Sequence, residues 1–157
     1  MLEQISTYFT IEMVYLWLNI GVIPFWLMLI FLPNSKLGSI FVSSIFPIFI
    51  LCCAYVYVIY NSYLGSFDFV NNFSLYLGIN NLSDLFSNDE FLIFFWIHFL
   101  AINLFCGSWM SKDGSRLLIS KYIMFFPLLI TYFVGPLGIF IYWIIRMFYA
   151  KKISLYD

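Results

Sequence analysis

His98 is the single histidine of the chain, and it lies inside the apolar run "FFWIHFLAINLFCGSW" from Phe94 to Trp109. An imidazole can transfer protons near neutral pH, bond a neighbouring helix or bind a metal. A metal site is not expected, because there is no second histidine and the three cysteines do not have a metal-ligand spacing. His98 is therefore the candidate catalytic acid–base residue. The structural alternative is an imidazole that bonds a neighbouring helix.

The composition indicates an integral membrane protein. Of 157 residues, 64% are hydrophobic and only 10% are charged, whereas roughly a quarter of the residues of soluble domains are charged. The mean hydropathy is +0.97. A chain of this size cannot hide so many apolar side chains in a core. The net charge of −1 also argues against nucleic acid as a partner.

The apolar runs predict an all-α integral membrane protein with four transmembrane helices, and residues 1–157 form a single membrane domain. A crossing helix needs about 20 mostly apolar residues. Four stretches qualify: 13–32, 39–60, 89–110 and 122–149. Internal prolines are expected to be tolerated in the first, second and fourth helices.

Residues 61–88, between the second and third helices, predict an interfacial amphipathic segment. Phe69, Phe73 and Leu77 recur at four-residue spacing among polar residues, which suits a short helix in the headgroup plane. Ser87 and Glu90 then have the spacing of a capping box, so the third helix is expected to start there. This start would put His98 roughly 15 Å into the membrane, near its centre.

The basic residues give conflicting indications of orientation. Four crossings would put both termini and the long loop on one side. Loops one and three contain four basic residues: Lys36, Lys112, Arg116 and Lys121. These place both loops in the cytoplasm or stroma. The C-terminal Arg146, Lys151 and Lys152 favour the opposite side, but the first helix usually dominates.

Two stripes of polar and small residues mark the candidate interior. The first helix carries Glu12, Tyr15, Asn19, Val22 and Trp26, and the fourth carries Thr131, Gly135, Gly138, Tyr142 and Arg146. One interpretation is helix packing, with Glu12 and Arg146 snorkelling at the ends. The other is a shared aromatic cavity for a long conjugated or isoprenoid ligand. The candidate ligand-binding residues are Asn19, Trp26, Trp96, His98, Asn103 and Tyr142.

His98 and Asn103 are five residues apart on the third helix, which separates them by about 140° around its axis. They therefore cannot both point at one ligand atom. A central helix with neighbours on two sides could bury both.

Three motifs carry a family resemblance: "IPFWLMLIFLP" from Ile23 to Pro33, "WIHFLAINLF" from Trp96 to Phe105, and "GPLGIFIYW" from Gly135 to Trp143. They resemble the four-helix membrane family of the plant neoxanthin-synthase, abscisic-acid-deficiency type, over most of residues 19–142. The resemblance implies a connection with carotenoids. It also implies redox-neutral epoxide opening to an allene, which needs an acid and a base but neither a metal nor a nicotinamide.

The chain departs from the family pattern at two positions. In that pattern the third-helix histidine is followed by Leu-Ala-Phe-Asp-Leu-Phe and then by an Arg-Trp pair. Asn103 stands at the Asp position and Ser108 at the Arg position. Replacing both partners avoids an unpaired buried charge, so the fold is expected to survive. Acid–base chemistry that depends on that Asp is not expected to survive the replacement.

The main hypothesis is a family member that binds a carotenoid or related isoprenoid. One alternative is a non-catalytic small subunit of a pigment–protein or other membrane complex, such as a photosynthetic one. Another is a redox-neutral carotenoid β-ring isomerase that uses His98. No cofactor is expected to be required, and a carotenoid is a candidate ligand. The expected location is a thylakoid or plastid membrane, or a bacterial inner membrane.

Overall fold

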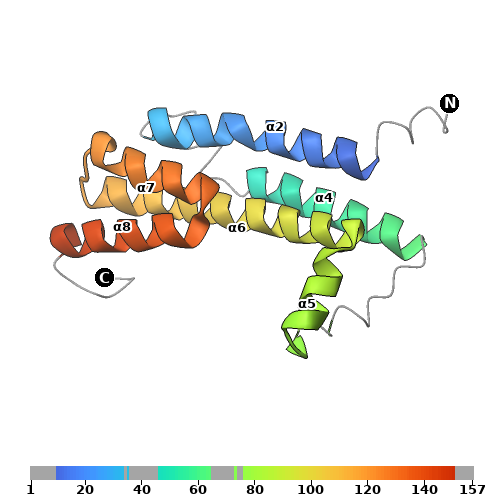
Figure 1. The fold of residues 1–157 in the computed structure, drawn as a ribbon. Coiled ribbons are helices and arrows are strands. Elements are labelled where there is room, and N and C mark those ends of the chain that lie inside the picture. The colour runs from blue at the N-terminus through green and yellow to red at the C-terminus, as the bar shows by residue number, and fades with distance from the viewer. Residues whose placement is uncertain (1–9, 34, 36–45, 65–72, 74–75, 151–157) are drawn as a thin grey trace. The chain divides into compact units, whose positions relative to one another are not determined.

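The structure, a computed structural model, describes residues 10–33, 35, 46–64, 73 and 76–150, without the side chains of 62–64. These residues form six α-helices and no strand, which confirms the all-α prediction for the described part (Figure 1). The chain divides into two compact units. Unit 1 comprises Met1–Ile20 and Ile50–Leu100, and unit 2 comprises Gly21–Phe49 and Ala101–Asp157.

Two helices, α2 and α6, are long and apolar enough to cross a membrane. Helix α2 spans Ile11–Phe31 and contains Pro24, close to the predicted bounds of 13–32. Helix α6 spans Asp89–Arg116, so it begins at the predicted residue but ends six residues later than predicted. The extra turns carry the polar sequence "SKDGSR", which a hydropathy criterion leaves out.

Helix α4 spans Phe46–Leu64, in place of the predicted 39–60. Pro47 lies in its first turn, where a proline costs no helical hydrogen bond. Residues 39–45 of the prediction lie outside the described residues. The described helix overlaps the prediction over residues 46–60 and ends four residues later, at Leu64.

An amphipathic helix is present within the predicted segment 61–88. Helix α5 spans Ile79–Phe86, and its apolar residues Ile79, Leu82 and Phe86 recur at spacings of three and four. Of the predicted stripe, Phe69 lies outside the described residues, and Phe73 and Leu77 precede α5 and are 73% and 77% exposed. Gly78, with φ 147°, is the residue before α5, so Phe73 and Leu77 lie outside this helix.

The predicted single helix over 122–149 is wrong, because the segment is two helices. Helix α7 spans Lys121–Phe133 and α8 spans Gly135–Ala150. Val134, with φ −139° and ψ 79°, interrupts them. Pro136 explains the break, since it has no N–H to donate to the Tyr132 carbonyl and its ring would clash with that carbonyl in a continuous helix. Pro24 and Pro127 lie inside α2 and α7 without ending these helices, whereas Pro136 lies in the first turn of α8.

Helices α7 and α8 pack against each other as a hairpin (Figure 1). Gly138 lies directly on α7, where a Cβ would meet Thr131 and would stand 2.6 Å from the carbonyl oxygen of Pro127. The Thr131 hydroxyl donates to that same carbonyl at 2.7 Å, so it is satisfied within α7. The absence of a side chain at Gly138 is what allows the two backbones to approach.

The turn from α6 to α7 is short and well defined. The Ile119 N–H donates to Gly114 O at 2.9 Å and the Leu118 N–H to Ser115 O at 3.2 Å, the pattern of a Schellman motif. Leu118 occupies the left-handed position with φ 56° and is 88% exposed. A leucine thus stands where glycine is usual.

Candidate functional site

A groove of 480 Å³ lies in unit 1, between the first turns of α2 and the N-terminal half of α6. Its walls are mostly apolar. The residues that line it are Ile11, Glu12, Tyr15, Asp89, Leu92, Ile93 and Trp96. The α6 residues recur at spacings of three and four, so one face of that helix forms one wall.

Trp96 is held in place by Asn19. The indole Nε1 donates to Asn19 Oδ1 at 3.3 Å, and Asn19 Nδ2 donates to the Tyr15 carbonyl at 2.7 Å. The Tyr15 and Trp96 rings are 5.6 Å apart and tilted by 42°. The structure therefore brings together two of the predicted ligand-binding residues, Asn19 and Trp96, and adds Tyr15 to them.

Two carboxylates, Glu12 and Asp89, stand in the first turns of α2 and α6, where negative charge is favoured by the helix dipole. Both line the groove, so it combines an aromatic wall with acceptors for ligand hydroxyl groups. The cap of α6 differs from the prediction. The Phe91 N–H donates to Asn88 Oδ1 at 3.0 Å, while the Ser87 hydroxyl donates to Ser83 O. The cap is therefore Asn88, one residue later than the predicted capping box.

His98 is exposed, so the expectation that α6 could bury it is wrong. It lies on a stripe of α6 with Phe95, Ile102 and Phe105, which are 42%, 46% and 56% exposed. It does not line the groove formed by the opposite side of the helix. Asn103, in contrast, is only 5% exposed. The 140° separation inferred from the sequence thus places the two residues in different surroundings.

Trp26 and Asn103 are packed in unit 2. Trp26 is 3% exposed, its ring is 5.4 Å from that of Tyr132, and a Cβ on Gly107 would stand 2.7 Å from it. The Asn103 amide oxygen lies against Gly135, at the break between α7 and α8. Among the described residues, Asn103 Nδ2 has no hydrogen-bond partner. Ser108, the other position that departs from the family pattern, is also buried.

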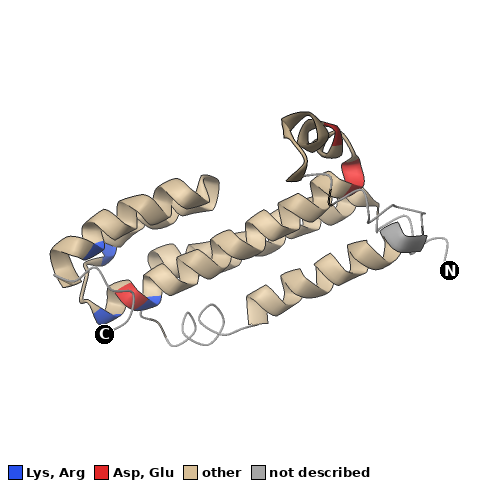
Figure 2. Ribbon diagram, turned by 90° about the horizontal axis from the view of Figure 1, so that it is seen from below, with Lys and Arg blue, Asp and Glu red and all other residues tan. Residues whose placement is uncertain are grey.

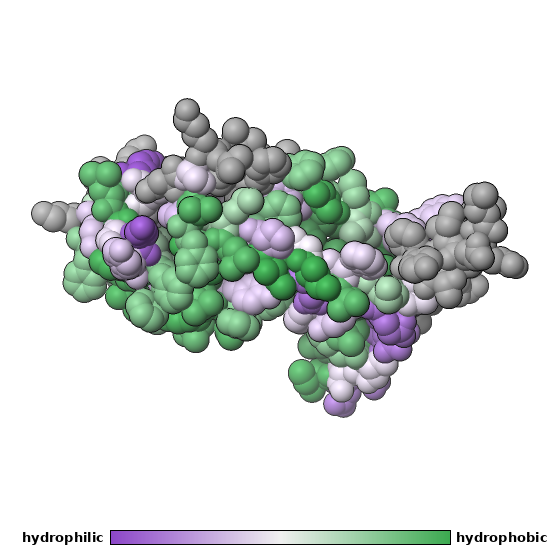
Figure 3. Space-filling model, turned by 90° about the horizontal axis from the view of Figure 1, so that it is seen from above, coloured by the Kyte–Doolittle hydropathy of each residue, from purple (hydrophilic) through white to green (hydrophobic). Residues whose placement is uncertain are grey.

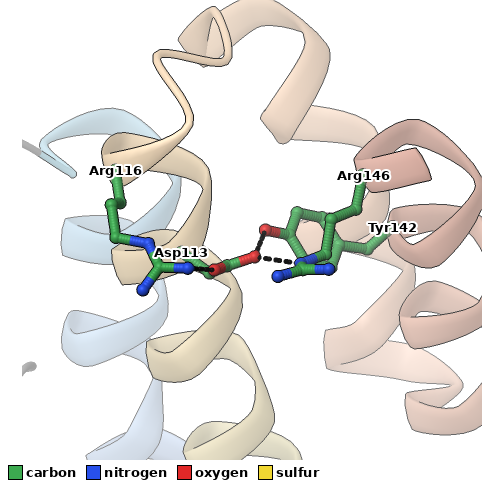
Figure 4. A network of polar contacts seen from close by, with 4 residues as sticks. All are labelled: Asp113, Arg116, Tyr142 and Arg146. Atoms are coloured by element: carbon green, nitrogen blue, oxygen red, sulfur yellow. Dashed lines mark hydrogen bonds and ion pairs between the residues drawn. The ribbon is translucent and has the colours of Figure 1, made fainter. Parts of the chain in front are cut away.

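The predicted stripe of the last segment is wholly buried: Thr131 in α7 and Gly135, Gly138, Tyr142 and Arg146 in α8. Arg146 does not snorkel as expected but is 1% exposed. Its Nε donates to Asp113 Oδ2 at 2.6 Å, and the Tyr142 hydroxyl donates to the same oxygen at 2.6 Å (Figure 4). Arg116, whose side chain is 52% exposed, reaches Asp113 Oδ1 at 3.5 Å.

Sequence reasoning missed Asp113, the centre of this network. The signal that could have found it was an acidic residue among three basic ones at the end of an apolar run. Tyr142 is 0% exposed and its hydroxyl is bonded to Asp113, which is a structural arrangement. Its predicted role in ligand binding stays a prediction, as do those of Trp26 and Asn103.

A second, smaller groove of 340 Å³ lies in unit 2, between the end of α2 and the start of α7. Its lining residues are Ile30, Phe31, Lys121, Tyr122, Phe125 and Phe126. Lys121 Nζ lies 5.4 Å from the centre of the Tyr122 ring, within cation–π range. Across the described residues, no three His, Cys, Asp or Glu side chains gather as a metal site would require.

The described residues define an all-helical fold with two helices long and apolar enough to cross a membrane and an aromatic groove between them. The chain belongs to the ABA DEFICIENT 4-like family, whose sequence model matches residues 13–142. This match confirms the family predicted from the three motifs.

Among curated proteins, the chain is similar to Protein ABA DEFICIENT 4, chloroplastic, of Arabidopsis thaliana. The two are 26% identical over 124 residues, which cover 73% of this chain and 56% of that protein. The chain therefore spans little more than half the length of this relative. No solved structure matches the chain.

Proposed function

We propose that this family member is an integral membrane protein that binds a carotenoid or a related isoprenoid, and that the groove between α2 and α6 receives the ligand's end group. The membrane location is supported by two helices of 21 and 28 residues with an apolar sequence. It is also supported by the many exposed apolar side chains, which predominate over the helical part of the face drawn in Figure 3. Trp17, Phe49 and Phe140, for example, are 61%, 61% and 62% exposed.

The observation that carries the binding proposal is the position of Trp96. Its indole is hydrogen-bonded to Asn19 and lies tilted beside the Tyr15 ring, and both aromatic side chains line the groove. The volume of 480 Å³ falls in the range of about 300–1,000 Å³ typical of ligand pockets. A ring end group fits this space, while the polyene would continue along the apolar surface.

The carboxylates of Glu12 and Asp89 extend the proposal to the chemistry of the end group. Both are acceptors at the groove, so they favour a ligand whose ring carries hydroxyl groups. A purely hydrocarbon ring would leave these groups without a partner from the ligand. Oxygenated carotenoids are therefore the preferred class.

The location follows from the same proposal. The similar Arabidopsis protein is chloroplastic by name. A thylakoid or other plastid membrane is therefore proposed, with a bacterial inner membrane as the counterpart in a prokaryote. Catalysis by His98 is not part of the preferred function, because His98 does not line the groove.

The test is co-purification of pigment from a host that makes both hydrocarbon and hydroxylated carotenoids. The wild-type chain, solubilised in mild detergent, is expected to retain hydroxylated pigment, measured by visible spectrum and extraction. Trp96→Leu should lose most of that pigment. Trp17→Leu is the matched control, because Trp17 is 61% exposed and outside the groove. A colourless wild-type protein, or equal retention by both variants, would contradict the proposal.

A second candidate function is a non-catalytic subunit of a larger membrane complex, such as a photosynthetic pigment–protein assembly. The observation that favours it is the exposed stripe around His98, since an ionisable side chain facing lipid is unfavourable unless a partner covers it. In that case His98→Leu should shift the purified particle to a smaller size, while Trp17→Leu should leave it unchanged. New pigment species in the host that vanish in His98→Ala would instead support the β-ring isomerase.

A further inference from the structure

Helices α7 and α8 are both too short to cross a membrane. They have 13 and 16 residues, which at 1.5 Å per residue gives about 20 and 24 Å. The hydrocarbon core of a bilayer is about 30 Å thick. The segment over 122–149 is long enough for one crossing only if it is continuous, and it is broken at Val134.

Two contacts within unit 2 give the depth of this hairpin along α6. At its open end, Arg146 and Tyr142 of α8 bond Asp113, in the last turns of α6. At its tip, Gly135 lies against Asn103. Asn103 precedes Asp113 by ten residues, so the tip lies about 15 Å deeper along α6 than the open end. That distance is about half the thickness of a membrane.

The end of α2 lies at the same level as the open end of the hairpin. The Phe31 and Phe125 rings are 6.1 Å apart, and Phe31 and Lys121 line the same groove. The C-terminal ends of α2, α6 and α8 and the start of α7 therefore share one end of unit 2.

We propose that α7 and α8 form a re-entrant hairpin that enters the membrane to about its midplane and returns to the face it left. The inference rests on the membrane location proposed above. The crossings are then α2, α6 and the 19-residue α4, which is about 28 Å long. The residues after α8 lie on the same face as the α6–α7 turn. This replaces the fourth crossing predicted from the sequence.

The distribution of charge supports this topology independently. Every one of the seven Lys and Arg residues then falls on or next to one face: Lys36, Lys112, Arg116, Lys121, Arg146, Lys151 and Lys152. Four crossings would divide them between the two faces. Within unit 2 the described basic residues lie at one end (Figure 2), whereas α6 begins with Asp89 and Glu90. Basic residues mark the cytoplasmic or stromal face, so a single basic face removes the conflict in the sequence.

The tip of the hairpin meets the requirement for irregular backbone at membrane depth. Such backbone must be covered by protein rather than exposed to lipid. Gly135 is buried, and the amide of Asn103, itself 5% exposed, lies against it. The polar side chain of Asn103, in the middle of α6, therefore lies beside the break between α7 and α8, where the helical hydrogen bonds are interrupted.

Cysteine accessibility tests the topology. In a full-length chain with Cys52, Cys53 and Cys106 replaced by Ala, single substitutions are made at Leu118 in the α6–α7 turn, at Tyr149 near the end of α8, and at Asn80 in α5. All three positions are exposed. A membrane-impermeant maleimide is applied to intact cells and to inverted vesicles. Leu118→Cys and Tyr149→Cys should label from the same side, and Asn80→Cys from the other.

Labelling of Tyr149→Cys from the side of Asn80→Cys would overturn the hairpin and restore a fourth crossing. Absence of the chain from washed membranes would instead contradict the membrane location on which the inference rests. If a cysteine variant does not accumulate, alkaline phosphatase and fluorescent-protein fusions after Asp157 report the side of the C-terminus. A C-terminal fusion on the basic face supports the hairpin, and one on the opposite face refutes it.

Discussion

The Nε of Arg146 donates to Asp113 Oδ2 at 2.6 Å, and both side chains are almost fully buried. The contact joins two residues 33 positions apart and fixes the end of α8 to the end of α6. A buried charge pair is a weak source of net stability, but removing one partner is costly. Its main effect here is therefore to specify how the hairpin docks.

Replacing Asp113 should strongly destabilise the protein. Asp113→Asn removes the carboxylate that neutralises the Arg146 guanidinium, and loss of one partner of a buried pair costs about 3–5 kcal/mol. Thermal unfolding in detergent measures the effect. Arg116→Gln is the matched control: that side chain is 52% exposed at 3.5 Å, and exposed pairs contribute about 0–1 kcal/mol. Equal stability of the two variants would show that the pair does not hold α8.

The close approach of α7 and α8 depends on Gly138. Gly138→Ala places a Cβ against Thr131 and 2.6 Å from the Pro127 carbonyl, which is backbone and cannot rotate away. We expect a loss of about 1–3 kcal/mol, as for overpacked cores. Gly21→Ala meets nothing within 4 Å inside α2 and should gain up to about 1 kcal/mol. Measured unfolding temperatures should move in opposite directions; a drop for both would contradict the packing argument.

Leu118 should be replaceable with a gain in stability. Its φ of 56° is a left-handed conformation that costs an L-residue roughly 1–2 kcal/mol. Leu118→Gly relieves this strain at the position where helices commonly end in glycine. Leu118→Ala removes the same exposed side chain but keeps the strain. A higher unfolding temperature for the glycine variant than for the alanine variant is the expected result, and the reverse order would be inconsistent with strain at this turn.

The orientation of Trp96 should depend on Asn19. Asn19→Leu removes the acceptor of the indole N–H and the donor to the Tyr15 carbonyl. We expect a stability loss of about 1 kcal/mol and a several-fold lower retention of pigment, measured by extraction from the purified protein. Asn80→Leu is the control, because Asn80 is exposed on α5. Pigment retention that is unchanged by Asn19→Leu would remove the ordered indole from the binding proposal.

The stripe Thr131, Gly135, Gly138, Tyr142 and Arg146 illustrates how much of the site was predictable. Helical periodicity identified every member as interior, and all five are buried. The same periodicity could not reveal the break at Val134. The stripe residues stay three or four positions apart on both sides of that residue, as they would in one continuous helix. Asp113 was missed because its partners come from another helix, and pair contacts leave no local pattern.

Local chemistry accounts for what the sequence alone determined: helical segments follow from apolar runs, and the family from three short motifs. Asn19 and Trp96, two ligand-binding candidates named from the sequence, are half-buried and hydrogen-bonded to each other, whereas His98 is exposed. The tertiary structure decided which of these residues meet, that Trp96 lies beside Tyr15 and that the last segment turns back on itself. The physical reason is that helix formation depends on neighbours in sequence, whereas a hairpin, a groove and a buried ion pair depend on which surfaces fit together.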